Sequence, residues 1–143
     1  MEARNYDVNK VTVSFLGVPL TGFSEGSKVK VERNVDAYTL KVGCDGDSCR
    51  SKSQNHSGRI TVRLSAGSPS NDALAGAAVL DENSGMGAGE LGVVDLNGTM
   101  LAHAGKAWVV KQPAADFEKE VGEREWVFET GDLELYVGGN YTT

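Results

Sequence analysis

Hydrophobic and polar residues alternate along most of this chain. The apolar members of the three clearest segments are Val11, Val13 and Phe15; Val29 and Val31; and Ile60, Val62 and Leu64. A period of two places alternate side chains on opposite faces of a β-strand, so each segment predicts a strand with one wet face. Similar patterning recurs in AYTLKV, KAWVVK, EWVFE and LELYV. Roughly seven or more short strands, separated by Gly, Asn, Asp and Pro, predict a mainly β chain folded as an antiparallel sandwich or barrel.

Two strand pairings are predicted from the local sequence. Asn97-Gly98 lies between LGVVDL and TMLAHA, and this dipeptide tolerates the positive φ angles of a type I′ hairpin turn. The stretch AADFEKEVGE has residue types that favour a helix, yet Phe117 and Val121 fit either period. We expect a strand there, in a hairpin with EWVFET.

One segment departs from the alternation and predicts a helix over about 70–84. Within SPSNDALAGAAVLDENSG, Leu74 and Ala78 recur at helical spacing. Ser68 or Ser70 is expected to cap the start, with Pro69 in the first turn. Gly85 is expected to end the helix in the left-handed conformation.

The polar stretch GCDGDSCRSKSQNHSG, residues 43–58, is expected to be a long irregular loop. A loop of that length in a compact domain is either disordered or functional. We interpret its Cys44 and Cys49 as reduced thiols of a cytoplasmic product. A zinc site with His56 and His103 is the alternative, although the paired spacing of zinc knuckles is absent. Asp45-Gly46-Asp47 lacks the further ligands of a calcium loop and is expected to be a surface turn.

Length and charge restrict the function. The chain has 143 residues, which predicts a single domain over 1–143, and its net charge of −6 argues against capture of nucleic acid. Its amino terminus has no apolar run typical of a signal peptide, and no stretch is long enough to span a bilayer. We therefore expect no membrane partner and a protein that stays where it is made.

Two glycine motifs resemble catalytic signatures but lie in the wrong local context. Gly22-Phe23-Ser24-Glu25-Gly26 matches the nucleophile elbow, yet the following SKVKVERNV alternates like a strand and not like the required helix. The motif GAGELG, residues 87–92, matches a dinucleotide-binding loop, but it follows the predicted helix and precedes a strand, which reverses the required order. We expect no enzyme, no cofactor and no metal.

The order of several blocks is more specific than any single motif. VERNVDAYT followed by KVGCDGD, then SGRITVRL, SPSND opening the helix, and the carboxyl-terminal EW, DLE and VGGN resemble the tail tube proteins of contractile-tailed bacteriophages over nearly the whole chain. Cys44 departs from the small residue expected there. The resemblance implies a β-sandwich with one flanking α-helix and a long inter-ring loop. It also implies hexameric rings whose strands join into a continuous inner barrel.

The resemblance also implies roles for particular residues. In such tubes an extended loop or hairpin reaches an adjacent ring, and the stretch at about 43–58 matches it, which would put Asp45, Asp47, Arg50 and Lys52 at ring-to-ring contacts. Polar strand faces would line the lumen or face a sheath, and their members are Lys28, Lys30, Glu32, Arg59, Thr61 and Arg63. Deleting residues 45–56 is expected to leave the fold intact and prevent long tubes.

The function implied is a structural subunit of the virion tail, assembled in the host bacterial cytoplasm, whose stacked rings form the conduit for DNA ejection. Expected partners are further copies of the chain, the tail sheath, baseplate and tail terminator proteins, the tape measure protein, and DNA passing without sequence-specific binding. Alternatives are the tube of a type VI secretion system or a phage-derived bacteriocin, or a monomeric β-sandwich binding module. An enzyme would need a reactive Ser24, Cys44 or Cys49.

Overall fold

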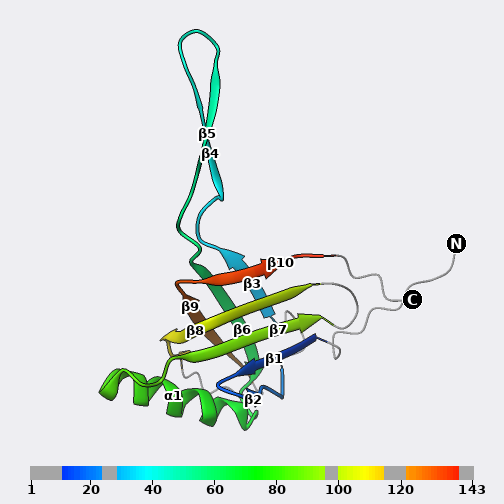
Figure 1. Cartoon of the computed structure of the whole chain (residues 1–143). Coiled ribbons are helices and arrows are strands. Elements are labelled where there is room, and N and C mark those ends of the chain that lie inside the picture. The colour runs from blue at the N-terminus through cyan, green and yellow to red at the C-terminus, as the bar shows by residue number, and fades with distance from the viewer. Residues whose placement is uncertain (1–10, 24–28, 96–99, 115–121, 139–143) are drawn as a thin grey trace, which may run out of the picture.

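The computed structural model describes residues 11–23, 29–95, 100–114 and 122–138. Strands make up most of this part, as the alternation predicts, and one helix accompanies them (Figure 1). The strands are β1 Val11–Phe15, β2 Val18–Pro19, β3 Val29–Arg33, β4 Tyr38–Val42, β5 Ser48–Lys52, β6 Gly58–Ser65, β7 Gly89–Asp95, β8 Leu101–Lys111, β9 Glu123–Thr130 and β10 Leu133–Tyr136. The helix is α1, Ser70–Ser84.

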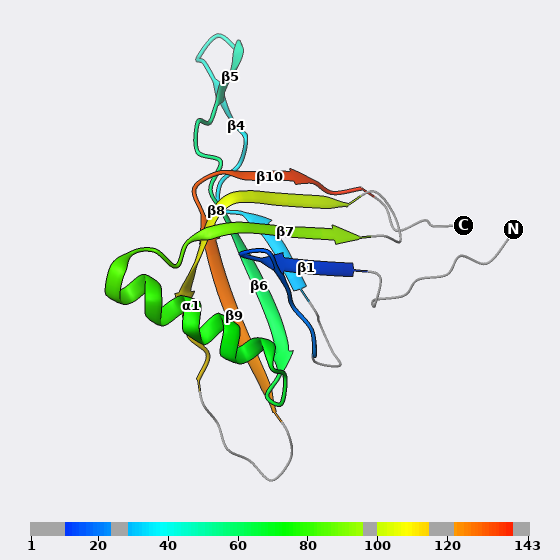
Figure 2. The same cartoon turned by 60° about the horizontal axis from the view of Figure 1, so that its bottom comes forward.

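The long strand β8 belongs to two layers. Its first part pairs with β7 and β10, and its second part, from Ala107, pairs with β9. We call β2-β1-β7-β8-β10 the first layer and β8-β9-β6-β3 the second layer. All pairings between these strands are antiparallel. The strands of the two layers cross each other, and the core lies between them (Figure 2).

The core consists of the apolar positions predicted by the period of two. Val13 and Phe15 of the first layer are buried, as are Ile60 and Phe128 of the second. The rings of Phe15 and Phe128 lie 4.9 Å apart between centroids and join the layers. Val29 of edge strand β3 is only half-buried, because β3 has a described neighbour on one side alone.

Helix α1 occupies the range expected from the sequence and packs Leu74 and Ala77 into the same core. It ends at Gly85, whose φ of 71° is left-handed and whose amide donates to the Asp81 carbonyl at 2.8 Å. Pro69 occupies the capping position and has no side-chain hydrogen bond, but the Ser68 hydroxyl, one of the two expected caps, accepts a hydrogen bond from the Ser70 amide at 3.2 Å. The same hydroxyl donates to the Thr21 carbonyl at 2.5 Å, which ties the helix to the chain after β2.

The stretch at 43–58 is not the irregular loop that we expected. Residues 48–52 form β5, which pairs with β4 in a separate two-stranded sheet. We call this hairpin, residues 38–52, the arm; it projects from the rest of the molecule, the body (Figure 1). The prediction was wrong because β5, with the sequence SCRSK, is exposed on both faces and so lacks hydrophobic alternation.

The predicted pairing of LGVVDL with TMLAHA is confirmed by the antiparallel ladder of β7 and β8. Asn97-Gly98 itself lies outside the described residues, as do Phe117 and Val121 of the second predicted hairpin. A close approach at Gly58 joins the layers: a Cβ there would overlap Leu133 and lie 3.0 Å from the Glu32 carbonyl oxygen. Glycine is therefore required where β6, β3 and β10 meet.

Candidate assembly surfaces

Strand β4 exposes three apolar side chains on one face of the arm. Directly opposed residues of antiparallel strands share a face, so Tyr38, Leu40 and Val42 lie together, opposite Lys52, Arg50 and Ser48 respectively. We call Tyr38, Leu40 and Val42 the arm stripe. Leu40 is 68% exposed and Val42 is 64% exposed. An isolated two-stranded hairpin is marginal in water, so this surface is typical of an element completed by a partner.

The residues predicted for ring-to-ring contact all lie on the arm. Arg50 and Lys52 share the face of the arm stripe, and the Arg50 guanidinium lies 4.3 Å from the centroid of the Tyr38 ring. Asp45 and Asp47 lie in the turn, where Gly46 has a φ of 86° and the Gly43 amide donates to the Asp47 carbonyl at 2.7 Å. Within the described chain these four side chains form no ion pair.

The two cysteines are also on the arm. Cys44 lies in the turn, Cys49 lies opposite Lys41 on the face away from the stripe, and both thiols are free and exposed. His103 lies on β8 in the body. The structure therefore does not support the zinc alternative, because no cluster of three potential ligands occurs among the described residues.

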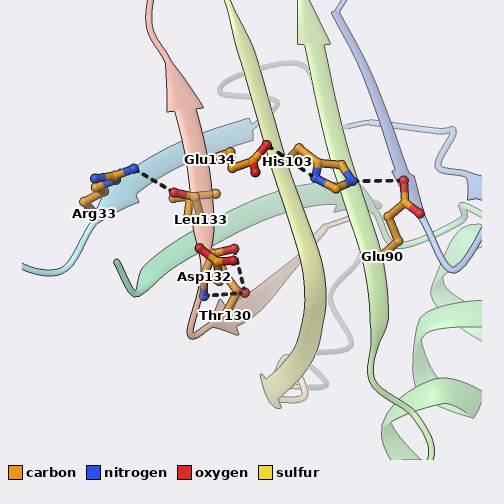
Figure 3. Close-up of polar contacts among 7 residues, drawn as sticks. All are labelled: Arg33, Glu90, His103, Thr130, Asp132, Leu133 and Glu134. Atoms are coloured by element: carbon orange, nitrogen blue, oxygen red, sulfur yellow. Dashed lines mark hydrogen bonds and ion pairs between the residues drawn. The ribbon is translucent and has the colours of Figure 1, made fainter. Parts of the chain in front are cut away.

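Hydrogen bonds at the base of the arm fix its root to both layers. The Arg33 side chain, at the end of β3, donates through Nη2 to the Leu133 carbonyl at 2.7 Å (Figure 3). The Leu133 amide in turn donates to the His56 carbonyl at 2.9 Å. The Ser53 amide donates to the Ala37 carbonyl at 2.8 Å and closes the arm at its root. These contacts tie the chain on both sides of the arm to the body.

The outer face of the second layer is charged but balanced. Arg59 and Glu129 lie opposite each other and approach to 2.6 Å, and Arg63 and Glu125 approach to 3.4 Å. Lys30 lies 3.9 Å from Glu32 on the same face. Thr61 lies between the two arginines, whereas Lys28 lies outside the described residues. Exposed ion pairs of this kind contribute only about 0–1 kcal/mol each to stability. Their carboxylates nevertheless neutralise the two arginines, so this face is not the cationic one that the β6 sequence alone suggested.

The outer face of the first layer is acidic, and its residues were missed by sequence reasoning. Glu90 of β7, His103 of β8 and Glu134 of β10 lie in a row across adjacent strands (Figure 3). His103 Nε2 lies 3.1 Å from Glu90, and Nδ1 lies 4.0 Å from Glu134. We call these three residues the acidic row. Nothing local in the sequence marks them, because only the register of β7, β8 and β10 brings them together.

The two glycine motifs lie where the sequence argument placed them. Strand β3 follows the elbow-like motif, although Ser24 lies outside the described residues. The GAGELG segment follows α1 and enters β7, so its order is helix and then strand. The helix start needed for binding a pyrophosphate is therefore missing from this motif.

The sequence matches a known protein family over most of its length. A family model described as "Bacteriophage PhiTE tail tube protein" matches residues 7–138. Structural protein ORF10 of Pseudomonas phage KPP10 is 34% identical to this chain over 94% of its length and 83% of that protein.

The fold is also similar to that of solved structures. A chain of the sheath–tube complex of an extracellular contractile injection system (PVC, extended state) has a TM-score of 0.59 and 14% identity, over 94% of this chain and 93% of that chain. The tube-terminating cap of the anti-feeding prophage has a TM-score of 0.55 and 9% identity, over 96% of each chain. The fold is thus that of the tube and terminator proteins of contractile injection systems. The chain belongs to the bacteriophage PhiTE tail tube protein family. It is a structural phage protein of the virion, as the resemblance of its sequence blocks predicted.

Proposed function

We propose that this chain is the repeating subunit of a contractile phage tail tube, stacked as hexameric rings into a conduit for DNA ejection. The observation that carries the proposal is the arm: a tail tube family member extends a hairpin with an exposed apolar stripe. A surface of that kind fits a subunit that is completed by further copies of itself. Sheath and terminator partners are supported by fold similarity to chains of a sheath–tube complex and of a sheath/tube terminator.

The two outer faces have different proposed roles. The acidic row lies on the first layer, whose outward positions on β1, β7, β10 and Leu101–Gly105 carry no lysine or arginine. Carboxylates repel phosphate, so a lumen lined by this layer would let DNA slide. The ion pairs of the second layer, with Arg59, Thr61, Arg63, Lys30 and Glu32, would then face the sheath.

Negative-stain electron microscopy over a concentration series, with light scattering for mass, tests the proposal. Hollow tubes of uniform width with six subunits in each ring are expected. A monomer at every concentration, including in the presence of a baseplate initiator, would contradict the proposal and favour a binding module.

Reversing the charge of the acidic row tests whether this row faces the lumen. In a Glu90→Lys/Glu134→Lys variant, the new lysines would attract the phosphates of a nucleic acid into the lumen. We therefore expect tubes of this variant to retain a fluorescent oligonucleotide at low salt and to protect it from a bulky nuclease. The matched control is Glu123→Lys/Glu125→Lys, which makes the same charge change on β9 of the second layer. Its oligonucleotide should stay open to digestion. Digestion in the first variant would place the acidic row on the outside.

A further inference from the structure

The structure places two exposed apolar surfaces at opposite ends of the molecule. The arm leaves the body at one end, and α1 crosses the other (Figures 1 and 2). We infer that the arm stripe of one copy docks on the outer face of α1 of a second copy. This inference rests on the proposed self-assembly and adds to it the receiving surface.

The outer face of α1 exposes large apolar side chains among its polar ones. Val79 is 46% exposed, Leu80 is 50% exposed, and Met86, just beyond the helix, is 75% exposed. Gly76 lies on the same side with open space at its Cβ position. Exposed apolar side chains grouped in this way on a surface helix are typical of contact with another surface.

Charge complementarity selects the arm as the occupant of this face. The arm stripe is accompanied by Arg50 and Lys52 on its own face, whereas the opposite face carries Lys41. Helix α1 exposes Asp72 and Glu82 and contains neither lysine nor arginine, whereas the Asp81 carboxylate already accepts a hydrogen bond from the Gly87 amide at 3.3 Å. Apolar groups flanked by cations on one surface would therefore meet apolar groups flanked by carboxylates on the other.

Docking of the arm on α1 would also allow copies to add to a stack one after another. Because the arm and α1 are different surfaces at opposite ends, the interface between copies is head-to-tail. A head-to-tail contact leaves one arm and one helix unused at the two ends of any stack. Each added copy would therefore present a new site for the next one.

Charge reversal with rescue tests the pairing in the full chain. Lys52→Glu is expected to raise at least tenfold the subunit concentration at which tubes appear in electron micrographs. The matched control Lys41→Glu makes the same charge change on the other face of the arm and should change that concentration less than twofold. Adding Asp72→Lys or Glu82→Lys to Lys52→Glu is expected to restore assembly to within threefold of wild type.

Disulfide crosslinking provides a second, direct measurement. In a Cys44→Ser/Cys49→Ser background, Leu40→Cys combined with Leu80→Cys should give a ladder of covalent multimers when assembled tubes are treated with diamide. Thr39 lies on the opposite face of the arm from Leu40. Thr39→Cys combined with Leu80→Cys should therefore give no ladder. If wild-type tubes form but the crosslinked ladder is absent and the second charge reversal does not restore assembly, the docking site is wrong and the tube function stands. A wild-type chain that never assembles would overturn both.

Discussion

Tubes are expected to disappear when the arm is removed, while the body keeps its fold. Replacing residues 38–52 by two glycines would leave the hydrogen bond from the Ser53 amide to the Ala37 carbonyl to close a short turn. This replacement is sharper than deletion of 45–56, because that deletion also removes His56, whose carbonyl accepts the hydrogen bond from Leu133. Electron microscopy and thermal unfolding would measure assembly and folding separately.

The size of the effect follows from the surface that is lost. Full burial of an aliphatic side chain contributes roughly 1.5–3 kcal/mol, so Leu40 and Val42 alone correspond to about two to four orders of magnitude in the concentration needed for assembly. The body should unfold within about 2 °C of wild type, because the arm stripe is exposed, β4 and β5 form a sheet of their own, and surface changes have small effects.

A matched pair of point variants separates the apolar contact from a general effect of the arm. Leu40→Asp lies on the arm stripe, and Thr39→Asp lies on the opposite face of the same strand. The first should prevent long tubes and the second should permit them. Equal tube lengths in the two variants would show that the stripe is not an assembly contact.

Phe128→Ala is expected to lower the free energy of unfolding by about 3–5 kcal/mol, which is typical of phenylalanine removal from a core. Phe128 is fully buried, and its ring packs against Phe15 across the two layers. Removing the ring would leave a cavity between the layers that surrounding side chains fill only in part. Because domains are stable by only about 5–15 kcal/mol, the variant would lose a large part of its total stability.

Urea unfolding followed by tryptophan fluorescence measures this loss. Val127→Ala is the matched control, since Val127 is the neighbouring residue of β9 on the outer face and is only half-buried. Its cost should stay near 1 kcal/mol or less, as for other partly exposed positions. A loss below 1 kcal/mol in Phe128→Ala would mean that the contact between the layers does not stabilise the sandwich.

Several features of the fold followed from short stretches of sequence because their causes are local. The period of two at Val11–Phe15 and around Ile60 located strands β1 and β6 and their buried faces. The helix from Ser70 to Ser84 was predicted for the same reason, since its spacing and Gly85 are properties of consecutive residues.

The arm shows where local pattern was insufficient. The segment YTLKV alternates like any half-buried strand, so its sequence alone suggested a side chain face packed on the core. In the structure the same face is exposed, because β4 pairs only with β5 and no other described strand lies against it. Alternation identifies which side chains share a face, but the surface that covers this face belongs to another element or another chain.

What the sequence determined by itself is the type of every element with a clear hydrophobic period, the family and the set of charged residues on the arm, because these depend on consecutive residues and on the order of sequence blocks. Only the tertiary structure decided that Arg59 and Arg63 are paired with β9 carboxylates and that Glu90, His103 and Glu134 form one row. These groupings depend on the register between strands far apart in the chain. Register is selected by burial of the whole sheet, which no single segment of the sequence contains.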